Sequence, residues 1–462
     1  MSDVPCIVNG DSMEAWEEPI QTGDIPETGE VFDVIVVGGG PAGSAAAAYN
    51  ALNGCKVLLI EKGVWPRDKI CGDAVGGKSL SHVKELGVKG MIEATPHFTV
   101  DSIIFGSGKG NTVRVMLPQE EFQKKEAGYS LPRLQFDYMM FKRCSEIVME
   151  NGGAAIQGFS VTDVHVDGGR ITGVSGGFGR RGDSDERRYS SALTIGAGGY
   201  NCPVAKTVTE TLHNEPMRDD EHYCGGFREY WEGVGGFSGT QGPIEIHFID
   251  EFNPGYFWLF PVKEGVVNVG VGMVFAEQRK QEGDKKSLKK MQDWVINNHP
   301  GFKKRFEKAK LVKGTSKGWQ LPFGSPRKGQ EHQPRRSATA GAMCVGDSAS
   351  LVDPFTGEGI GNALLSAKMT SKYFDKDAHS EGFPEEAAEA YMKELWESLG
   401  PELSNSYKLQ RWAKKKWLMN WVIGKAGRSE ELADMMTGMI ADKEASRQLW
   451  SKWFLFKTLI LS

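Results

Sequence analysis

The chain has 462 residues, of which 40% are apolar and 25% charged, a composition that fits a folded protein with two or three lobes. Its net charge is only −5 and it contains no long basic block, which argues against a nucleic-acid partner. The seven cysteines are scattered and lack a Cys-x-x-Cys spacing. They therefore indicate neither a disulfide framework nor a metal or iron–sulfur site, and they fit a reducing cytoplasm.

The first thirty residues form a distinct acidic segment. Residues 1–30 carry several carboxylates but no Lys or Arg, and they lack the apolar run of a signal peptide. We expect a poorly ordered extension, with a partner-docking tail as the alternative. No stretch of the chain reaches the ~20 apolar residues that are needed to span a bilayer.

Order is expected to begin at Val31 with a βαβ unit. Residues 31–37 are an apolar, β-branched run typical of a buried parallel strand, and residues 44–53 are alanine-rich and helical. Residues 55–60 form a second buried strand that ends at Glu61. Strand, glycine turn, helix and strand together predict one βαβ unit.

Beyond about residue 100 the pattern changes to shorter strands separated by glycine turns. Exposed hairpins are expected around residues 168–183, and an amphipathic helix around residues 288–296. Apolar strand character returns at residues 342–345, and from about residue 384 the chain has a helical pattern. A first domain interrupted by a second one explains this order.

A glycine-rich loop lies between the first strand and the helix. Gly38-Gly39-Gly40-Pro41-Ala42-Gly43 satisfies G-x-G-x-x-G. In such loops the first glycine permits a tight turn, the second lets a pyrophosphate approach the backbone, and the third allows helix and strand to pack closely. Glu61 can accept hydrogen bonds from a ribose. The cofactor-binding candidates here are Gly38, Gly40, Pro41, Ala42, Gly43, Glu61 and Lys62. The loop alone does not separate FAD from NAD.

A second glycine-rich segment near residue 350 decides between the two cofactors. Gly346-Asp347 follows a strand and leads to the turn 353–361. The segment resembles the Gly-Asp fingerprint of the para-hydroxybenzoate-hydroxylase-like FAD proteins. This resemblance implies that Asp347 binds the ribityl chain of FAD, and that a helix N-terminus stabilises the negative charge of the reduced flavin. The residues implied at the flavin pyrimidine edge are Pro354, Gly357, Gly359 and Ile360.

Three further segments carry motifs that are known within that superfamily. Pro66-Arg67-Asp68-Lys69-Ile70-Cys71-Gly72-Asp73 resembles a Pro-Arg-x-Lys-x-Cys-Gly signature. Residues 254–261 and 267–272 resemble a P-x-x-Y-x-W-x-F-P and N-V-G-x-G pair. Together these segments are similar to the geranylgeranyl reductase family, which includes digeranylgeranylglycerophospholipid reductases. The resemblance spans roughly residues 31–375. It implies further FAD contacts at Cys71, Gly72, Ala74, Arg133 and Val161.

The resemblance implies an α/β (mixed α+β) fold. We expect a Rossmann-like FAD/NAD(P)-binding domain, an inserted antiparallel β-sheet substrate domain and a C-terminal helical region. The expected boundaries are 1–30 for the extension, 31–100, 129–207 and 338–380 for the discontinuous FAD-binding domain, 101–128 and 208–337 for the substrate domain, and 381–462 for the helical region.

One departure concerns the electron donor. Where relatives often have Gly-Ala-Asp-Gly, this chain has Gly196-Ala197-Gly198-Gly199-Tyr200. In hydroxylases that aspartate–glycine pair is associated with pyridine-nucleotide contacts, so direct use of NADPH is in question. The donor is therefore expected to be either a reduced ferredoxin-like iron–sulfur protein or NAD(P)H.

Cys71, Tyr256 and Trp258 are the candidate catalytic residues. Cys71 lies in the flavin signature, where it can shape the site or tune the redox chemistry, although a free cysteine is commonly just a small buried hydrophobe. Tyr256 and Trp258 alternate along a strand and so point to the same face, either into the core or as an aromatic wall for a polyprenyl chain. The sequence identifies no proton donor: neither Asp73 nor Glu358 carries enough signal.

The last sixty residues are rich in tryptophan. Lysines 414–416 lie among Trp412, Trp417 and Trp421, and Trp450 and Trp453 follow near the end. Tryptophan beside lysine is typical of an interfacial helix, while packing on the protein's own body is the alternative. We expect a cytoplasmic protein that contacts a membrane surface peripherally, because a lipid substrate must be collected from a bilayer.

Three functions follow from the resemblance. The first is an FAD-dependent reductase that saturates the double bonds of geranylgeranyl chains in an isoprenoid lipid. The second is an oxygen-using monooxygenase or halogenase, because residues 256–261 partly resemble the W-x-W-x-I-P segment of halogenases. The third is a membrane-surface electron-transfer flavoprotein.

Overall fold

The computed structural model describes residues 20, 22–117 and 128–429. Most of the predicted acidic extension therefore lies outside the described residues. Residues 26–30 are described, and they lie against strand β10: the hydroxyl of Tyr189 donates to the Pro26 carbonyl oxygen at 3.0 Å, and the Gly29 N–H donates to the Arg188 carbonyl oxygen at 2.7 Å. This part of the segment is anchored to the body of the protein.

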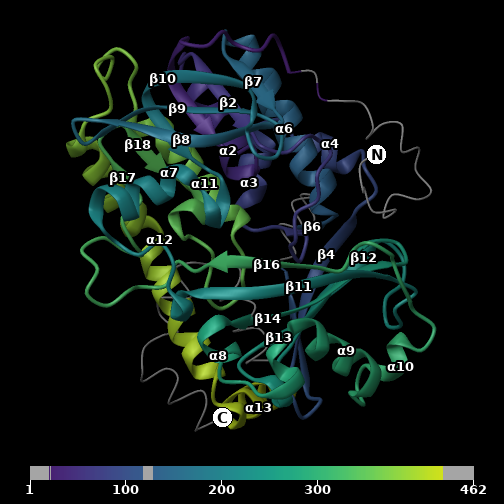
Figure 1. The fold of residues 1–462 in the computed structure, drawn as a ribbon. Helices are drawn as coiled ribbons and strands as arrows, with labels where there is room; N and C mark the ends of the chain where they lie inside the picture. Colours follow the sequence, from purple (N-terminus) through teal and green to yellow (C-terminus); the bar gives the residue numbers. More distant parts are fainter. Residues whose placement is uncertain (1–19, 21, 118–127, 430–462) are drawn as a thin grey trace.

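The fold contains two sheets, one above the other in Figure 1. Within the described residues the first sheet has eight strands, and its main path runs β17-β18-β10-β1-β2-β7. Its parallel centre is formed by β1 (Val31–Val37), β2 (Val57–Glu61), β7 (Ala154–Gln157), β10 (Ser184–Gly196) and β18 (Ala342–Cys344). The antiparallel strands β8 (Phe159–Asp167), β9 (Arg170–Phe178) and β17 (Ala338–Thr339) extend it.

The predicted βαβ unit is confirmed as β1, α2 (Pro41–Leu52) and β2. The helix begins at Pro41 rather than at Ser44, because proline is well suited to the first helical position and Gly40 serves as the N-cap. The predicted hairpins are confirmed by β8, β9 and β10, and residues 180–183 lie in the turn before β10.

Among the described residues the second sheet is antiparallel except for β4 and β12, which pair in parallel. Its main path runs β15-β11-β14-β13-β12-β4-β6-β3, with β16 on β11 and β5 on β4. The strands are β3 (Ala74–Val75), β4 (Phe98–Gly106), β5 (Thr112–Met116), β6 (Gly128–Ser130), β11 (Tyr223–Glu232), β12 (Gln241–His247), β13 (Tyr256–Lys263), β14 (Val266–Val274), β15 (Lys310–Leu311) and β16 (Lys317–Pro322).

Helices pack against both sheets. The large apolar core joins the first sheet to α2, α6 (Arg133–Glu150), α11 (Ile360–Tyr373) and α12 (Glu385–Ala413). A second core lies between the second sheet and α9 (Leu288–Asn298), which confirms the predicted amphipathic helix, and α10 (Lys303–Phe306). Shorter helices are α3 (Ser79–Glu85), α4 (Lys89–Glu93), α7 (Pro203–Lys206) and α8 (Phe275–Gln278).

The C-terminal region begins with two helices. The long helix α12 passes from the first sheet towards the second, and α13 (Lys416–Ala426) packs beside β5 (Figure 1). Trp450 and Trp453 lie outside the described residues. Among the described residues, no helix combines the length and apolar character that crossing a bilayer requires. The boundaries of the discontinuous domains remain a prediction. Strands β3 and β6 belong to the second sheet.

Candidate functional site

The first glycine loop connects β1 to α2 by a close turn. Gly38 has φ +113°, a region that favours glycine, and a Cβ at this position would lie 2.5 Å from the carbonyl oxygen of Ala197. A Cβ on Gly43 would overlap the carbonyl oxygen of Gly38, so this glycine is needed for helix and strand to approach. These positions have the close packing that the motif predicts.

Gly40 differs from its neighbours because there is room above it. The nearest heavy atom to a Cβ built on Gly40 is the Nη2 of Arg67, at 3.8 Å. Gly40 is also the N-cap of α2, where no side chain caps the first backbone N–H groups. An uncapped helix N-terminus with open space and a guanidinium beside it suits a pyrophosphate.

Glu61 organises the loop from the end of β2. Its carboxylate accepts hydrogen bonds from the backbone N–H of Gly39 at 2.8 Å and of Gly63 at 2.6 Å. The Arg67 guanidinium donates to the same carboxylate at 3.0 Å and stacks on the Trp65 ring, 4.2 Å from its centroid. Glu61 is thus placed at the strand end where a ribose contact is predicted, while Lys62 beside it is exposed.

The second glycine turn lies before α11. Asp347 is in the short helix that follows β18, and Lys69 donates to its carboxylate at 3.2 Å. The turn is held by Asp353, whose Oδ1 accepts hydrogen bonds from the backbone N–H groups of Phe355 and Thr356 at 2.9 and 2.8 Å. Burial raises the pKa of the Asp353 carboxyl, while these donors lower it.

The same turn contacts the aromatic strand of the second sheet. Gly357 has φ +74°, and a Cβ there would lie 2.7 Å from the Tyr256 hydroxyl oxygen. That hydroxyl donates to the carbonyl oxygen of Thr356 at 3.3 Å. Gly359 caps α11 and Ile360 is its first residue, so the predicted helix N-terminus is in place, with Pro354 at the start of the turn.

Tyr256 and Trp258 lie on one face of strand β13, as the alternation predicts. The rings of Tyr256 and Trp258 lie 5.9 Å apart on one face. Further along this face, the Phe260 ring lies against Gly72, since a Cβ on Gly72 would approach within 2.8 Å of it. The half-buried Cys71 precedes Gly72. The structure therefore brings the Cys71–Gly72 turn, β13 and the second glycine turn together.

Arg133, Ala74 and Val161 are the remaining predicted cofactor contacts. The Arg133 guanidinium is buried and forms a two-point ion pair with Asp137. Burial lowers the pKa of this arginine, but the Asp137 carboxylate, with a smaller contribution from Cys71, outweighs burial and raises it. Ala74 begins β3. Val161 lies on β8, where it pairs with Gly176 of β9. The roles of these residues in binding stay predictions.

Of the two carboxyls without an assigned role, Asp73 is the more unusual. It is completely buried, and burial raises the pKa of its carboxyl from 3.8 to about 6. Three donors approach the carboxylate from Tyr230, Asn268 and the backbone of Arg133. Glu358 has a local role, because its carboxylate accepts the backbone N–H of Gly361 at 2.7 Å in the first turn of α11.

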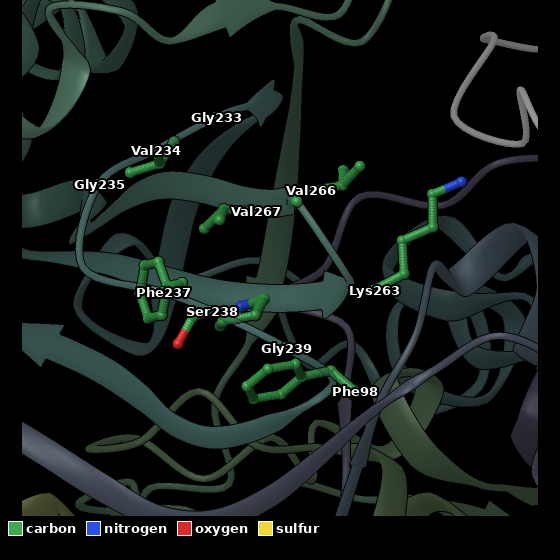
Figure 2. Close-up of a pocket in the computed structure, with 12 residues that line it drawn as sticks. Phe98, Gly233, Val234, Gly235, Phe237, Ser238, Gly239, Lys263, Val266 and Val267 are labelled. Atoms are coloured by element: carbon green, nitrogen blue, oxygen red, sulfur yellow. The ribbon is translucent and has the colours of Figure 1, made fainter.

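A separate cavity of about 240 Å³ opens at the far end of β13. Figure 2 shows the rings of Phe98 and Phe237 near Val267, with the Lys263 ammonium group directed away from them. None of the predicted cofactor or catalytic residues lines this cavity. It is therefore distinct from the site at the two glycine turns.

Arg67, Lys69 and Asn268 were not among the predicted site residues, yet all three contact the site. Arg67 faces Gly40 and Glu61, Lys69 pairs with Asp347, and Asn268 binds the Cys71 carbonyl oxygen at 2.7 Å. Their signal was present, since each lies in a motif quoted for the family resemblance. Spacing alone does not show which motif residues face a ligand.

The geometry fits FAD on the evidence of this chain's own residues. The space over Gly40, the uncapped helix and the Arg67 guanidinium suit a pyrophosphate. At the other end, Gly357 and the N-terminus of α11 offer an aromatic, anion-stabilising place for a flavin ring.

Comparison with known proteins supports this assignment. Residues 33–177 match the family model of FAD dependent oxidoreductases, and residues 240–314 match the geranylgeranyl reductase catalytic domain. Menaquinone reductase of Mycobacterium tuberculosis is 27% identical over 375 residues, covering 78% of this chain and 80% of that protein. Digeranylgeranylglycerophospholipid reductase of Thermoplasma acidophilum is 25% identical over 427 residues, covering 90% and 92%.

Solved structures establish the fold. A geranylgeranyl bacteriochlorophyll reductase-like protein from Thermoplasma acidophilum has a TM-score of 0.69 at 20% identity, covering 91% of this chain and 98% of its own. A flavin-dependent brominase has a TM-score of 0.68 at 18% identity, covering 90% and 97%. The predicted Rossmann-like FAD-binding fold is confirmed. The family matches indicate a flavoprotein, an FAD-dependent oxidoreductase in which residues 240–314 resemble the geranylgeranyl reductase catalytic domain.

Proposed function

We propose that this chain reduces carbon–carbon double bonds in the polyprenyl chains of an isoprenoid lipid. The observation that carries the proposal is the meeting of three elements: the second glycine turn, the Cys71–Gly72 turn and the aromatic face of β13. An alkyl substrate needs an apolar wall beside the redox cofactor, and this face offers one. Tyr256, Trp258 and Cys71 are the residues proposed to line it.

Bound FAD, once reduced by the electron donor, would supply the hydride, and the residues of the chain would position the lipid. An isolated alkene is weakly polarised, so a fixed orientation in a water-poor site must provide much of the acceleration. Trp258 is 7% exposed and its indole N–H is held by Asn268, so its ring has a defined orientation. Gly38, Gly40, Gly43, Glu61 and Asp347 are proposed to hold the cofactor.

The named relatives support a polyprenyl lipid as the substrate class. One is a menaquinone reductase and the other a digeranylgeranylglycerophospholipid reductase. Menaquinone and digeranylgeranylglycerophospholipids differ in the polar part of the molecule, but both carry polyprenyl chains. We therefore propose recognition of the polyprenyl chain, with geranylgeranyl chains as the first substrate to test.

Two electron donors are proposed, a ferredoxin-like iron–sulfur protein and NAD(P)H. The segment that departs from the relatives' Gly-Ala-Asp-Gly pattern is tightly packed: Ala197 contacts the Gly38 turn, and the Tyr200 ring lies edge-on to Trp319 at 5.3 Å. This packing favours the iron–sulfur protein over direct hydride supply by a nucleotide at that segment. Reduction rates of the bound flavin with each donor compare the two.

A membrane-surface location is proposed for α13. Trp417 is 67% exposed and Trp421 is 39% exposed, one helical turn apart, and the exposed Lys415 and Lys416 precede them. On its inner side the helix packs through Met419 into the apolar cluster that contains Tyr256. A lipid leaving the bilayer at α13 would thus meet the apolar surroundings of the proposed site.

Sedimentation with anionic phospholipid vesicles tests this surface. We expect binding by the FAD-loaded protein to fall in Trp417→Ser/Trp421→Ser. Leu52→Ala, at a residue that is 56% exposed on α2, is the matched control and should bind as the native protein does. Equal sedimentation of all three proteins would overturn the membrane role.

Activity is tested anaerobically with dithionite-reduced, FAD-loaded protein and a geranylgeranyl lipid. Mass spectrometry should show the gain of two hydrogens for each reduced double bond, and this gain should be lost in Trp258→Ala. Product that forms only with oxygen would favour the oxygenase or halogenase alternative, which the brominase fold leaves open. Flavin that cycles with electron carriers but leaves the lipid unchanged would favour the electron-transfer alternative.

A further inference from the structure

A buried chain of hydrogen bonds joins the Cys71 turn to the aromatic strand. Its centre is Asn268 on β14, which is fully buried. The side-chain nitrogen of Asn268 donates to the Cys71 carbonyl oxygen and to the Asp73 carboxylate, both at 2.7 Å. Its side-chain oxygen accepts the indole N–H of Trp258 at 2.8 Å. One side chain therefore binds both proposed walls of the substrate face.

Asp73 fixes the position of this asparagine. Its φ is +70°, a conformation that a residue other than glycine keeps only when its surroundings hold it. Besides Asn268, its carboxylate accepts the Tyr230 hydroxyl and the backbone N–H of Arg133, the latter at 3.3 Å. Every donor around the carboxylate comes from a different element, so Asp73 ties β11, β14 and α6 to the Cys71 turn.

The positive charge next to this network is also fixed. The Arg228 guanidinium is completely buried, lies 4.3 Å from the centroid of the Tyr230 ring and pairs with Asp68 at 2.9 Å. Lys317 donates to the same Asp68 carboxylate at 3.1 Å. Ion pairs with Asp68 thus hold the Arg228 and Lys317 charges in place beside the Tyr230–Asp73 contact.

We propose that Asp73, Asn268 and Tyr230 are positioning residues, here called the Asp73 clamp, which hold the Cys71 carbonyl and the Trp258 indole in one fixed arrangement. All three clamp residues are fully buried, so we infer that their effect acts through the contacts to Cys71 and Trp258. An apolar polyprenyl chain forms no hydrogen bonds that could orient it. The position of its double bond therefore depends on site residues that are held in a fixed position.

The test uses two variants and one matched control in the FAD-loaded protein. Tyr230→Phe removes one donor to Asp73, and Asn268→Leu removes the contacts to Cys71 and Trp258 while keeping the side-chain size. Tyr189→Phe is the control, because Tyr189 is equally buried and its hydroxyl also donates to one acceptor, the Pro26 carbonyl oxygen on the first sheet. Near-ultraviolet circular dichroism checks that each variant is folded.

The first measurement is the alkylation rate of Cys71 by iodoacetamide, read by peptide mass spectrometry. The other cysteines among the described residues are buried, so Cys71 is distinguishable; these are Cys55, Cys144, Cys202, Cys224 and Cys344. We expect alkylation to accelerate about tenfold in Tyr230→Phe and Asn268→Leu, because losing a buried hydrogen bond to a charged group raises the population of the open turn by roughly that factor. Tyr189→Phe should react at the native rate.

The second measurement is turnover of the geranylgeranyl lipid, and this part rests on the proposed function. Both clamp variants should lower kcat with the FAD dissociation constant unchanged, which a general loss of structure would not do. Asn268→Asp places a second carboxylate against Asp73 and should lower kcat. Adding Asp73→Asn exchanges the two side chains and restores a hydrogen bond between an amide and a carboxylate, so kcat should recover about tenfold.

The clamp would be overturned if Tyr230→Phe and Asn268→Leu both kept the native values, that is, if the Cys71 alkylation rate and kcat each stayed within about twofold of the native protein. Should Asn268→Leu not fold, Tyr230→Phe alone decides, since it removes a single oxygen atom. A native protein that leaves the lipid unreduced would contradict the proposed function, while the alkylation rates would still decide on the clamp.

Discussion

Replacing Gly40 by alanine separates cofactor binding from folding. Gly40 has φ −71° and ψ −179°, which alanine adopts readily, and the nearest heavy atom to the added methyl group would be the Arg67 Nη2 at 3.8 Å. The substitution thus meets no obstacle within the protein. If the pyrophosphate of FAD lies against this residue, the methyl group occupies its place.

Two magnitudes follow from this geometry. In the apoprotein, alanine reduces the freedom of the unfolded chain but is a poorer N-cap, and these opposite effects leave a change in the free energy of unfolding of less than about 1 kcal/mol. For FAD, displacement costs at least one hydrogen bond from a backbone N–H to a phosphate, about 2–3 kcal/mol, so the dissociation constant should rise about 30- to 150-fold.

The assay is a titration of apoprotein with FAD, followed by flavin fluorescence, together with urea unfolding of the same samples. Gly90→Ala is the control, because Gly90, in α4, likewise has open space around an added Cβ, with no heavy atom within 4 Å, and lies away from both glycine turns. Native FAD affinity in Gly40→Ala would refute the placement of the pyrophosphate. A large loss of apoprotein stability in Gly40→Ala would contradict the claim that the protein leaves room for a methyl group at this residue.

Three further substitutions test other parts of the account. Gly43→Ala should destabilise the apoprotein by about 3 kcal/mol or more, because its Cβ would overlap the Gly38 carbonyl oxygen, and an unchanged urea midpoint would contradict this. Gly357→Ala should weaken FAD binding through its φ of +74° and its clash with the Tyr256 hydroxyl, and adding Tyr256→Phe should recover part of the affinity in the same titration. Because burial raises the pKa of Asp73 from 3.8 to about 6, the folded state holds this proton more tightly than the unfolded state, and the contribution of Asp73 to stability falls as pH rises from about 4 to about 6. The free energy of unfolding of the native protein, taken relative to Asp73→Asn, should therefore fall by about 2 kcal/mol across that window, and parallel urea-derived pH profiles would contradict the assignment.

The local elements could be predicted because their signals are local. The apolar run of β1, the glycine loop and the alanine-rich helix are adjacent in the chain, and their order leaves few alternatives to a βαβ unit. The alternation of Tyr256 and Trp258 likewise placed both rings on one face of β13. The alanine-rich pattern places the start of α2 at residue 44, three residues late, because the helix starts at a proline that the alanine pattern does not include.

The contacts within the site could not be predicted, because they join distant parts of the chain. Asn268 reaches Asp73 across 195 positions, and Arg228 reaches Asp68 across 160. A strand pattern fixes which face a residue occupies but not which loop packs on it. The motifs of the family resemblance contained these residues, yet only the fold shows that they bind each other.

The central claim is that electrons pass from the bound flavin to an alkene of a polyprenyl lipid. The most direct measurement is a single turnover without oxygen, in which FAD-loaded protein is reduced, excess reductant is removed, and a geranylgeranyl lipid is added. The account predicts that the yellow absorbance of oxidised flavin returns as the lipid gains two hydrogens per flavin reoxidised. Flavin that stays reduced in the presence of the lipid, with no change in lipid mass, would contradict it.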